Sequence, residues 1–372
     1  MSTDQSFKPL RILHSESAVG WAGQEQYIFR MVGAMRDRGH HMEVVCQPHA
    51  MMVERLRDAG FTVHTLPMRG TMNYLRGVGK IKKILRAGNF DVLNTHSRRD
   101  TLLAGMAGRL AGTPLIVRTR HLAKPPGSLL SYNKVPHRIT TASNFVRQQL
   151  IDRGVPEGHV ATVYPAVEFP PQTGQSTLRA ELKLAPNDIV VGCVSALRHK
   201  KGHRELIQAM APLIAGRPNL HLVVVGDGSP VFEELQAQAQ EAGLTRRVHL
   251  LGRRDDVPNL MEGFDIFAMA TRQEASGTVF VEAGAMGVPV IGTNIDGVPE
   301  MMQDGVNGML VPLDDIPALT QAIRRLVEDP ELRQRMGQAG VEFCRNSGHF
   351  SLKAMVERVE SAYVRWLGEL KK

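Results

Sequence analysis

Residues 271–293 read TRQEASGTVFVEAGAMGVPVIGT, and this stretch holds the most informative pattern in the chain. Four small residues, Ala275 to Thr278, lead into an apolar run with the composition of a buried helix, and Val290–Thr293 has the composition of a strand. Glu282 is the one charged residue in the apolar run. We expect it to have a partner, because burying a lone carboxylate is prohibitive. A helix that begins near Ala275 also offers free backbone amides and the positive end of its dipole to a phosphate group.

Glu274 lies eight residues before Glu282, directly ahead of the small residues. At a rise of about 1.5 Å per residue, Glu282 would lie roughly 6–9 Å along the helix from a phosphate at its start. That offset suits hydrogen bonds that Glu282 accepts from the ribose of a nucleotide whose diphosphate lies at the helix start. The structural alternative is a buried carboxylate paired with an arginine, beside an unrelated loop glutamate, since short motifs give false positives.

Strand, turn and helix alternate on both sides of this stretch. In the first part of the chain we expect strands at residues 11–14, 42–46, 61–66, 91–94, 115–119 and 139–142, and in the second part at 189–195, 220–225, 248–250, 266–270, 290–293 and 309–311. Residues 164–176, YPAVEFPPQTGQS, interrupt this alternation with three prolines and have the composition of a linker. Alternating strands and helices predict parallel sheets that are covered by helices on both faces.

The expected fold is therefore α/β, with two doubly wound Rossmann-like domains facing a central cleft. We place the first domain at residues 1–168 and the second at residues 169–351. A length of 372 residues also favours two domains, at roughly 100–200 residues for each. Ligands of such sheets bind beyond the carboxyl ends of the strands, so residues at those ends are the first candidates for function.

Composition disfavours several classes of protein. No apolar run reaches the roughly 18 residues needed to span a bilayer. The N-terminal segment has an early acid and no apolar core, unlike a signal peptide. The three cysteines, Cys46, Cys193 and Cys344, are scattered and show no metal-ligand spacing. We therefore expect a cytoplasmic protein without a metal site.

The net charge of +8 is unevenly distributed along the chain. Residues 1–170 carry 23 basic and 12 acidic side chains, whereas the remainder carries 22 and 25. Residues 59–90 contain no acid, and their pattern predicts a basic amphipathic helix over residues 74–86. The cations are Arg69, Arg76, Lys80, Lys82, Lys83 and Arg86, and the apolar residues at helical spacing are Tyr74, Leu75, Val78, Ile81, Ile84 and Leu85. Two interpretations remain open: a solvated helix face, or peripheral contact with anionic lipids at the inner face of the plasma membrane.

A second candidate site follows the strand at 189–195, where residues 195–206 read SALRHKKGHREL. Arg198, Lys200 and Lys201 lie between a strand end and a helix start, and a glycine follows them. Such cations suit a diphosphate, because arginine can bond two oxygens and lysine supplies a point charge. A basic surface turn is the alternative. The Gly226-Asp227-Gly228 turn after the next strand adds only weak support.

In the first half, residues 20–25, GWAGQE, follow the first strand and open a helix. The spacing is not G-x-G-x-x-G and no acidic residue ends the second strand, which disfavours a nicotinamide dinucleotide. His96 and His121 each lie at a strand end, where a histidine either acts at a site or makes structural hydrogen bonds. Neither belongs to a metal-binding pattern such as H-E-x-x-H.

Together these motifs resemble those of the retaining GT-B-fold glycosyltransferases of family 4 (glycosyl transferases group 1), over nearly the whole chain. The E-x7-E signature of that family matches Glu274 and Glu282, and its K-G pair matches Lys201 and Gly202. The segments VVVGDG, GVPE and DGVNGMLVP also match. The resemblance implies a GT-B fold in which the last helix, at about 352–372, packs back on the first domain.

The family pattern also implies a role for each matching position. It assigns the catalytic group to His121, Glu274, Lys201 and Arg198, donor binding to Gly23, Gly226, Arg254, Ser276, Gly277, Thr278 and Glu282, and the acceptor side to His96 and Arg120. The sequence departs from the family at two positions. Ala196 stands where the family often has an arginine, so Arg198 would supply that charge, and Ala22 replaces the first glycine of the glycine loop.

The resemblance implies glycosyl transfer with retention from a nucleotide sugar, with UDP favoured over GDP on family frequency. It implies front-face attack in which a donor phosphate oxygen takes the acceptor proton. Metal and cofactor would not be required, because protein cations replace the metal. The expected acceptor is a glycan or a lipid-linked molecule of bacterial lipopolysaccharide or cell-envelope synthesis, and not a nucleic acid.

Two other functions fit the same fold. A sugar-nucleotide epimerase would need acid–base groups, for which His96, His121 and Glu274 are candidates. The long loop at residues 124–136 and the basic first half favour a separate anionic acceptor, and hence transfer. A nucleotide-sugar sensor without catalysis is disfavoured, because the donor-site motifs are largely intact.

Overall fold

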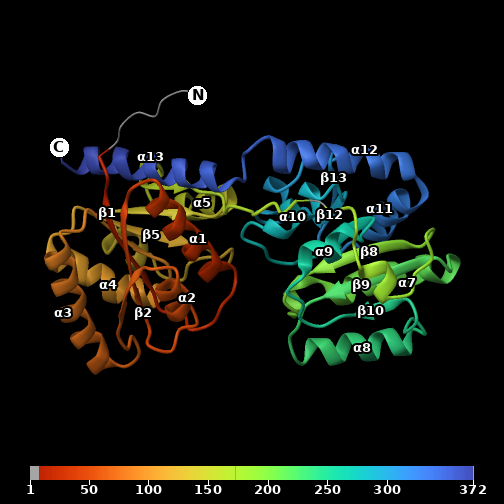
Figure 1. Cartoon of the computed structure of the whole chain (residues 1–372), viewed down its shortest axis with the longest axis horizontal. Coiled ribbons are helices and arrows are strands. Elements are labelled where there is room, and N and C mark those ends of the chain that lie inside the picture. The colour runs from red at the N-terminus through yellow and green to blue at the C-terminus, as the bar shows by residue number, and fades with distance from the viewer. Residues whose placement is uncertain (1–7, 172, 372) are drawn as a thin grey trace. The chain divides into compact units, whose positions relative to one another are not determined.

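The computed structural model describes residues 8–171 and 173–371, and the chain divides into two compact units (Figure 1). The N-terminal unit runs to Ala166 and resumes at Leu352, and the C-terminal unit spans Val167–Ser351. The transition after Ala166 falls inside the proline-rich segment 164–176. Each unit is built on one parallel sheet, which confirms the α/β class and the two Rossmann-like folds predicted from the alternating pattern.

In the described part of the N-terminal unit, seven parallel strands have the order β3-β2-β1-β4-β5-β6-β7. The strands are β1 (Arg11–Glu16), β2 (His41–Cys46), β3 (Thr62–Thr65), β4 (Val92–Thr95), β5 (Leu115–Arg120), β6 (Arg138–Thr141) and β7 (Val160–Thr162). The helices are α1 (Gly23–Asp37), α2 (Met52–Asp58), α3 (Thr71–Gly88), α4 (Arg98–Ala111), α5 (Asn144–Ile151) and α13 (Leu352–Leu370), with short turns η1 (Leu130–Lys134) and η2 (Glu157–His159). The sequence pattern misses β7, because three residues are too few to show a period.

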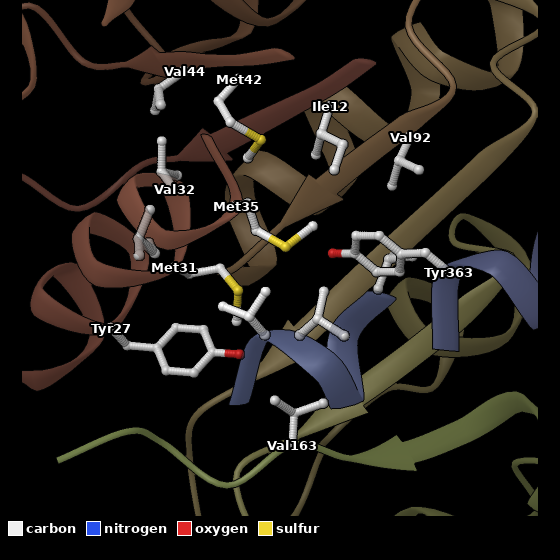
Figure 2. Packing of buried hydrophobic residues seen from close by; sticks show 14 of the residues in the cluster. Ile12, Tyr27, Met31, Val32, Met35, Met42, Val44, Val92, Val163 and Tyr363 are labelled. Carbon is white, nitrogen blue, oxygen red and sulfur yellow. The ribbon is translucent and has the colours of Figure 1, made fainter. Parts of the chain in front are cut away.

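Helix α13 completes the core of the N-terminal unit. Its residues Val359, Tyr363 and Trp366 are buried in the cluster that also contains Tyr27 of α1. Figure 2 shows the rings of Tyr27 and Tyr363 among the methionine side chains of this cluster. The side chain of Asn94 donates a hydrogen bond to the hydroxyl of Tyr363 at 2.8 Å and ties α13 to β4. Each large apolar side chain buried in this way contributes about 1.5–3 kcal/mol.

In the described part of the C-terminal unit, six parallel strands have the order β10-β9-β8-β11-β12-β13. The strands are β8 (Ile189–Val194), β9 (Leu220–Val225), β10 (Val248–Leu250), β11 (Ile266–Met269), β12 (Val290–Thr293) and β13 (Gly308–Val311). The helices are α6 (Leu178–Glu181), α7 (His203–Gly216), α8 (Val231–Glu241), α9 (Val257–Glu262), α10 (Thr278–Ala285), α11 (Ile316–Glu328) and α12 (Pro330–Val341), with short turns η3 (His199–Lys201), η4 (Val298–Glu300) and η5 (Glu342–Asn346).

The strand order reverses once in each sheet. In the N-terminal unit the reversal lies between β1 and β4, and in the C-terminal unit it lies between β8 and β11. Loops that leave such neighbouring strands on opposite faces open a crevice at the carboxyl ends of the strands, where α/β proteins bind ligands. Gly23 and His96 follow β1 and β4, and Lys201 and Glu274 follow β8 and β11. The other candidates lie at the ends of neighbouring strands: Arg120 and His121 at β5, Gly226 after β9 and Arg254 after β10.

Helix α3 forms where the periodicity predicts a basic helix. Ile81 and Leu85 are buried as expected, and Val78 is half-buried. Leu75 is 64% exposed, so its assignment to the apolar face is wrong. The reason is that the buried face is centred on Gly77 and Ile81, and position 75 lies on the other side of the helix. No helix in the described residues has the length and apolar character needed to cross a membrane.

Candidate functional site

Helix α10 begins where the small residues predict a helix start. Gly277 precedes it with a φ of 69°, a left-handed conformation that favours glycine, and a Cβ there would lie 3.1 Å from the Cγ of Glu274. Ser276 is buried and Thr278 is the first helical residue. The first backbone amides of a helix have no acceptor within it. The predicted phosphate-binding residues 276–278 therefore lie where such amides are available.

Glu282 lies on the second turn of α10 and is half-buried. Its neighbours Val281 and Ala283 are fully buried, so the apolar side of the helix faces away from the carboxylate. The desolvation penalty on Glu282 is therefore smaller than the apolar sequence suggests. Its contact with a ribose remains a prediction.

Lys201 and Glu274 meet at the reversal between β8 and β11. The Nζ atom of Lys201 donates a hydrogen bond to Oε2 of Glu274, and each side chain is 17% exposed. The backbone amide of Glu274 donates to Oδ2 of Asp296 at 3.0 Å, which fixes the loop after β11. A diphosphate carries more negative charge than one carboxylate, so it can draw the lysine away from Glu274.

Two glycines allow close approaches between loops at the carboxyl ends of β8 and its two neighbours, β9 and β11. Gly202 has a φ of 73°, and a Cβ there would collide with the carbonyl oxygen of Ala270. Gly226 has a φ of 146°, and a Cβ there would collide with the carbonyl oxygen of Ser195. Because the obstructing atoms belong to the backbone, no side-chain movement would relieve either clash. Arg198 lies exposed in the same turn as Lys201, at the surface of the candidate site.

Lys200 and Asp296 extend this charged group. The Nζ atom of Lys200 donates to Oε1 of Gln273 at 3.3 Å. Burial lowers the pKa of Lys200, and the neighbouring charge of Lys201 acts in the same direction. Burial also raises the pKa of Asp296, with a contribution from Glu274. An added anion would stabilise the charged form of each lysine, so the group is suited to receiving a phosphate.

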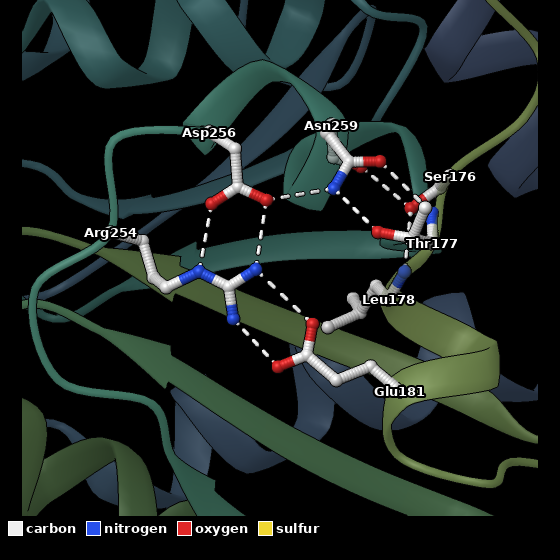
Figure 3. Close-up of polar contacts among 7 residues, drawn as sticks. All are labelled: Ser176, Thr177, Leu178, Glu181, Arg254, Asp256 and Asn259. Atoms are coloured by element: carbon white, nitrogen blue, oxygen red, sulfur yellow. Dashed lines mark hydrogen bonds and ion pairs between the residues drawn. The ribbon is translucent and has the colours of Figure 1, made fainter.

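Arg254 lies in an ion-pair network at the surface of the C-terminal unit (Figure 3). Its Nη1 donates to Oε1 of Glu181 at 2.6 Å, and its Nε donates to Oδ1 of Asp256 at 2.8 Å. Asn259 donates both to Oδ2 of Asp256 and to the hydroxyl of Thr177, each at 2.9 Å. The network joins the start of α9 to α6. The predicted contact of Arg254 with the donor nucleotide sugar would therefore be made by a side chain that is already bonded to Glu181 and Asp256.

Three histidines gather at the reversal in the N-terminal unit. His14 comes from β1, His96 follows β4 and His121 follows β5. His96 bonds through its Nε2 to Nδ1 of His14 at 2.9 Å and through its Nδ1 to Nε2 of His121 at 3.1 Å. Tyr27 of α1 packs edge-on against His121, with ring centroids 4.9 Å apart. The sequence pattern indicates His96 and His121 but not His14, because an isolated histidine inside a strand carries no local signal.

Glu16 is a second residue that the sequence analysis misses. It is fully buried at the end of β1 and accepts hydrogen bonds from the Ala18 amide at 2.6 Å, the Ser97 hydroxyl at 2.7 Å and the Gln24 amide group. These bonds tie the glycine loop to the start of α4. Burial is the first cause of its raised pKa. The sequence signal that could have indicated Glu16 is a carboxylate at the end of a strand, next to a glycine loop.

Gly23, the predicted donor-binding glycine, is the first residue of α1. A Cβ built on it would meet no atom of the described residues within 4 Å. The open space in front of this backbone is compatible with the close approach of a ligand.

Arg120 lies on the last position of β5 and is buried. Its guanidinium donates to the hydroxyl of Tyr132 and to the carbonyl oxygen of Lys124. Arg118, two residues earlier on the same face, lies over the ring of Tyr132 at 3.8 Å and donates to the carbonyl oxygen of Ser131 at 3.1 Å. The two arginines hold the loop at residues 124–136. The acceptor-side role of Arg120 remains a prediction.

Two Rossmann-like units, each built on one parallel sheet with a single strand reversal, define an α/β protein of the GT-B type. The model of glycosyltransferase family 4 matches residues 21–169, and that of glycosyl transferases group 1 matches residues 174–343. The chain therefore belongs to the family 4 (group 1) glycosyltransferases, whose two models match its two halves, and it is a glycosyltransferase.

Individual relatives support this assignment. The UDP-Gal:alpha-D-GlcNAc-diphosphoundecaprenol alpha-1,3-galactosyltransferase of Escherichia coli is 23% identical over 95% of this chain and 97% of its own. A GDP-mannose-dependent monoacylated alpha-(1-6)-phosphatidylinositol monomannoside mannosyltransferase of Corynebacterium glutamicum is 30% identical over 64% of this chain and 67% of its own. The crystal structure of HepE from Anabaena in complex with UDP has a TM-score of 0.86 at 22% identity, covering 96% of this chain and all of that one. This last similarity establishes the fold.

Proposed function

We propose that this enzyme transfers a sugar from a nucleotide diphosphate sugar, with UDP-sugars favoured, to a glycan or lipid-linked acceptor, with retention of configuration. The proposed setting is bacterial lipopolysaccharide or cell-envelope synthesis. The observation that carries the proposal is the Lys201–Glu274 contact next to the start of α10 at the strand reversal. This arrangement provides a cation and helix amides for the charge that develops on a leaving diphosphate. The E. coli relative, whose name specifies UDP-Gal and a diphosphoundecaprenol-linked acceptor, supports the choice of donor and acceptor.

In the proposed reaction, the bond between the sugar and the diphosphate loosens to give an oxocarbenium-like state. Lys201, with Arg198 nearby, turns to the diphosphate and stabilises its charge together with the amides of α10. Glu274, once released from Lys201, accepts hydrogen bonds from hydroxyls of the donor sugar, and Glu282 accepts them from the ribose. The acceptor hydroxyl attacks from the face that the leaving group vacates. Its proton passes to a diphosphate oxygen, so no enzyme nucleophile takes part. In this proposal the protein cations take the place of a metal ion, and no cofactor is needed.

A sugar-nucleotide epimerase is the alternative, and one observation favours it. His96 and His121 lie 3.1 Å apart through their ring nitrogens, as two acid–base groups could. Burial lowers the pKa of both rings, so at neutral pH neither is the imidazolium that a general acid would require.

Incubation of the protein with UDP-sugars and GDP-sugars, with and without a polyprenyl-diphosphate-linked sugar, distinguishes these functions. Transfer predicts nucleotide release that rises strongly with the acceptor, and a product whose anomeric proton coupling shows the configuration of the donor. An epimerase predicts an isomerised sugar nucleotide without any acceptor. A sensor predicts binding without either product. Isomerisation alone, or a product of inverted configuration, would overturn the proposal.

We also propose that α3 makes peripheral contact with an anionic membrane. Five residues of α3 with helical spacing, here called the α3 stripe, are exposed: Met72, Leu75, Arg76, Lys80 and Lys83. Two apolar side chains beside three cations form the pattern by which an amphipathic helix lies at a lipid headgroup region. Lys82 is half-buried and is therefore left out of the stripe. Arg86 is exposed, but it is also left out because it donates to the carbonyl oxygen of Leu110 at 3.2 Å.

A further inference from the structure

The three histidines of the N-terminal unit form a continuous chain of hydrogen bonds. His14 lies in β1, and His96 and His121 directly follow β4 and β5. These strands are neighbours in the sheet, so the strand spacing sets the distance between the rings. The planes of His14 and His96 are inclined by 17°, and those of His96 and His121 by 23°. Both bonds join the Nδ1 of one ring to the Nε2 of the next.

Such a chain of neutral imidazoles has only two arrangements of its protons. A neutral imidazole carries one N–H donor and one acceptor nitrogen. If Nδ1 of His14 donates to His96, then His96 donates from its own Nδ1 to His121, and the remaining proton of His121 is on Nδ1. If the direction is reversed, Nδ1 of His121 carries no proton and is an acceptor. The state of the first ring therefore determines the state of the third.

The surroundings favour the neutral form of all three rings. His14 is 1% exposed and His96 is 3% exposed. Burial lowers the pKa of His14 to about 3 and that of His121 to about 3, and it holds the pKa of His96 well below its ordinary value. A protonated His96 would donate to both neighbouring rings and so uncouple them, because an imidazolium has two donors and no acceptor. The two-state description therefore holds at neutral pH.

We propose that His14 and His96 are positioning residues that set, through this two-bond chain, whether Nδ1 of His121 donates or accepts a hydrogen bond toward the substrate. This inference rests on the proposed function, in which His121 lies next to the reacting sugar. A diphosphate oxygen only accepts hydrogen bonds, so His121 would have to donate to it. A sugar hydroxyl that already donates to another acceptor can likewise only accept a hydrogen bond from His121. A histidine with one fixed tautomer is preorganised for such a partner, whereas a mixed population is not.

The test combines nitrogen NMR with kinetics. In protein labelled with ¹⁵N-histidine and without substrate, protonated and unprotonated ring nitrogens resonate far apart, so the spectrum reports the tautomer of His121 directly. The wild type should show one tautomer. His14→Phe keeps an aromatic ring but removes both ring nitrogens. In this variant His121 should be a mixture of its two tautomers. His14→Asn places an amide group near the former Nδ1 and should restore the single tautomer.

The kinetic expectation follows from the loss of one neutral hydrogen bond. His14→Phe should lower kcat about 2- to 12-fold with less change in KM for the donor, and His14→Asn should recover most of the loss. A matched control is available in the C-terminal unit, where Nδ1 of His221 and Nε2 of His249 lie 3.1 Å apart in the same kind of pair. His249→Phe should change neither the His121 spectrum nor the kcat.

Three results would overturn the inference, and they are distinguishable. An unchanged His121 tautomer in His14→Phe, with transfer still observed in the wild type, rejects the chain but leaves the proposed function intact. A changed tautomer with unchanged kcat rejects the positioning role. A wild type that shows a single tautomer but transfers no sugar rejects the proposed function, and with it the substrate-facing part of the inference.

Discussion

Lys201 has two anionic partners at different stages of the proposed reaction. In the structure it bonds to Glu274, and in the reaction it would bond to the diphosphate. The exchange would need no large movement of the lysine, because the position proposed for the diphosphate, at the start of α10, lies at the same strand reversal as Glu274. Glu274 is held independently through its backbone amide and Asp296, and therefore stays in place when the lysine turns away.

Lys201→Ala should lose transfer far more than nucleoside binding. Removing one electrostatic stabiliser of a developing charge commonly costs about 2.7–4 kcal/mol, or roughly 10²–10³ in kcat. The check is to compare kcat for an identified donor with the affinity for nucleoside measured by calorimetry. Lys200→Ala is the matched control, because its Nζ bonds to the neutral Gln273 and it should lose less. Near-normal turnover in Lys201→Ala would transfer the role to Arg198.

Arg254→Gln should destabilise the C-terminal unit and change the titration of Asp256. Hydrogen bonds from Arg254 are the first cause that lowers the pKa of Asp256 to about 2. A carboxyl group whose pKa is lowered in the fold stabilises the fold at pH values above its ordinary pKa, near 3.8. This contribution is lost as the pH falls through about 2. The variant should therefore raise the pKa of Asp256, read by NMR, and lower the Tm at neutral pH. An unchanged Tm would show that the network in Figure 3 contributes nothing measurable.

At the scale of elements, local signals predict more than distant contacts do. The start of α10 and the turn after β8 are visible in sequence, because small residues, glycines and cations follow apolar strand runs. By contrast, Glu16 and His14 have roles only because β1 lies next to β4, and no pattern within β1 reveals that neighbour. The burial of α13 likewise depends on pairs such as Arg38 and Glu360, whose Nε and Oε1 atoms are 2.6 Å apart although their residues are 322 positions apart.

The exposed α3 stripe leads to a prediction about membranes. Replacing Arg76, Lys80 and Lys83 together by Gln should weaken co-sedimentation with anionic vesicles about 100-fold, since each cation near such a surface contributes about 1 kcal/mol. Binding of the wild type should also fall steeply with salt, because charges are screened beyond about 8 Å at physiological ionic strength. The three replaced side chains are exposed, so the fold and the donor site should be unaffected.

A charge-matched control uses exposed arginines of the C-terminal unit. Changing Arg324, Arg325 and Arg335 to Gln removes the same charge from α11 and α12 and should leave vesicle binding intact. Equal losses in the two triple variants would mean that net charge alone drives binding. A wild type that ignores anionic vesicles at low salt would show that α3 is only a solvated helix.

At the scale of the whole molecule, buried histidines couple stability to pH. His14 and His121 are neutral in the fold down to about pH 3, whereas in the unfolded chain they bind protons below about 6.5. The unfolded state thus holds more protons between these values, so the free energy of unfolding falls as pH falls, by about 1.4 kcal/mol per pH unit for each histidine.

Urea denaturation between pH 7 and pH 5 measures this slope. The buried carboxyls of Glu16 and Asp100 have raised pKa values and act in the opposite direction, so the wild type must be compared with His14→Phe. The slope should be shallower in the variant by the share of one histidine. Identical slopes would mean that His14 is protonated in the fold.

The return of α13 to the N-terminal unit has a consequence for how the protein is made on the ribosome. The C-terminal unit is continuous from Val167 to Ser351, so all of its strands have been synthesised before α13 exists. The N-terminal unit starts first, yet it lacks Tyr363 and Trp366 until α13 has emerged. Its apolar core stays open throughout the synthesis of the other unit. During that interval the exposed face of α1 is the surface of the nascent chain that a chaperone would have to cover.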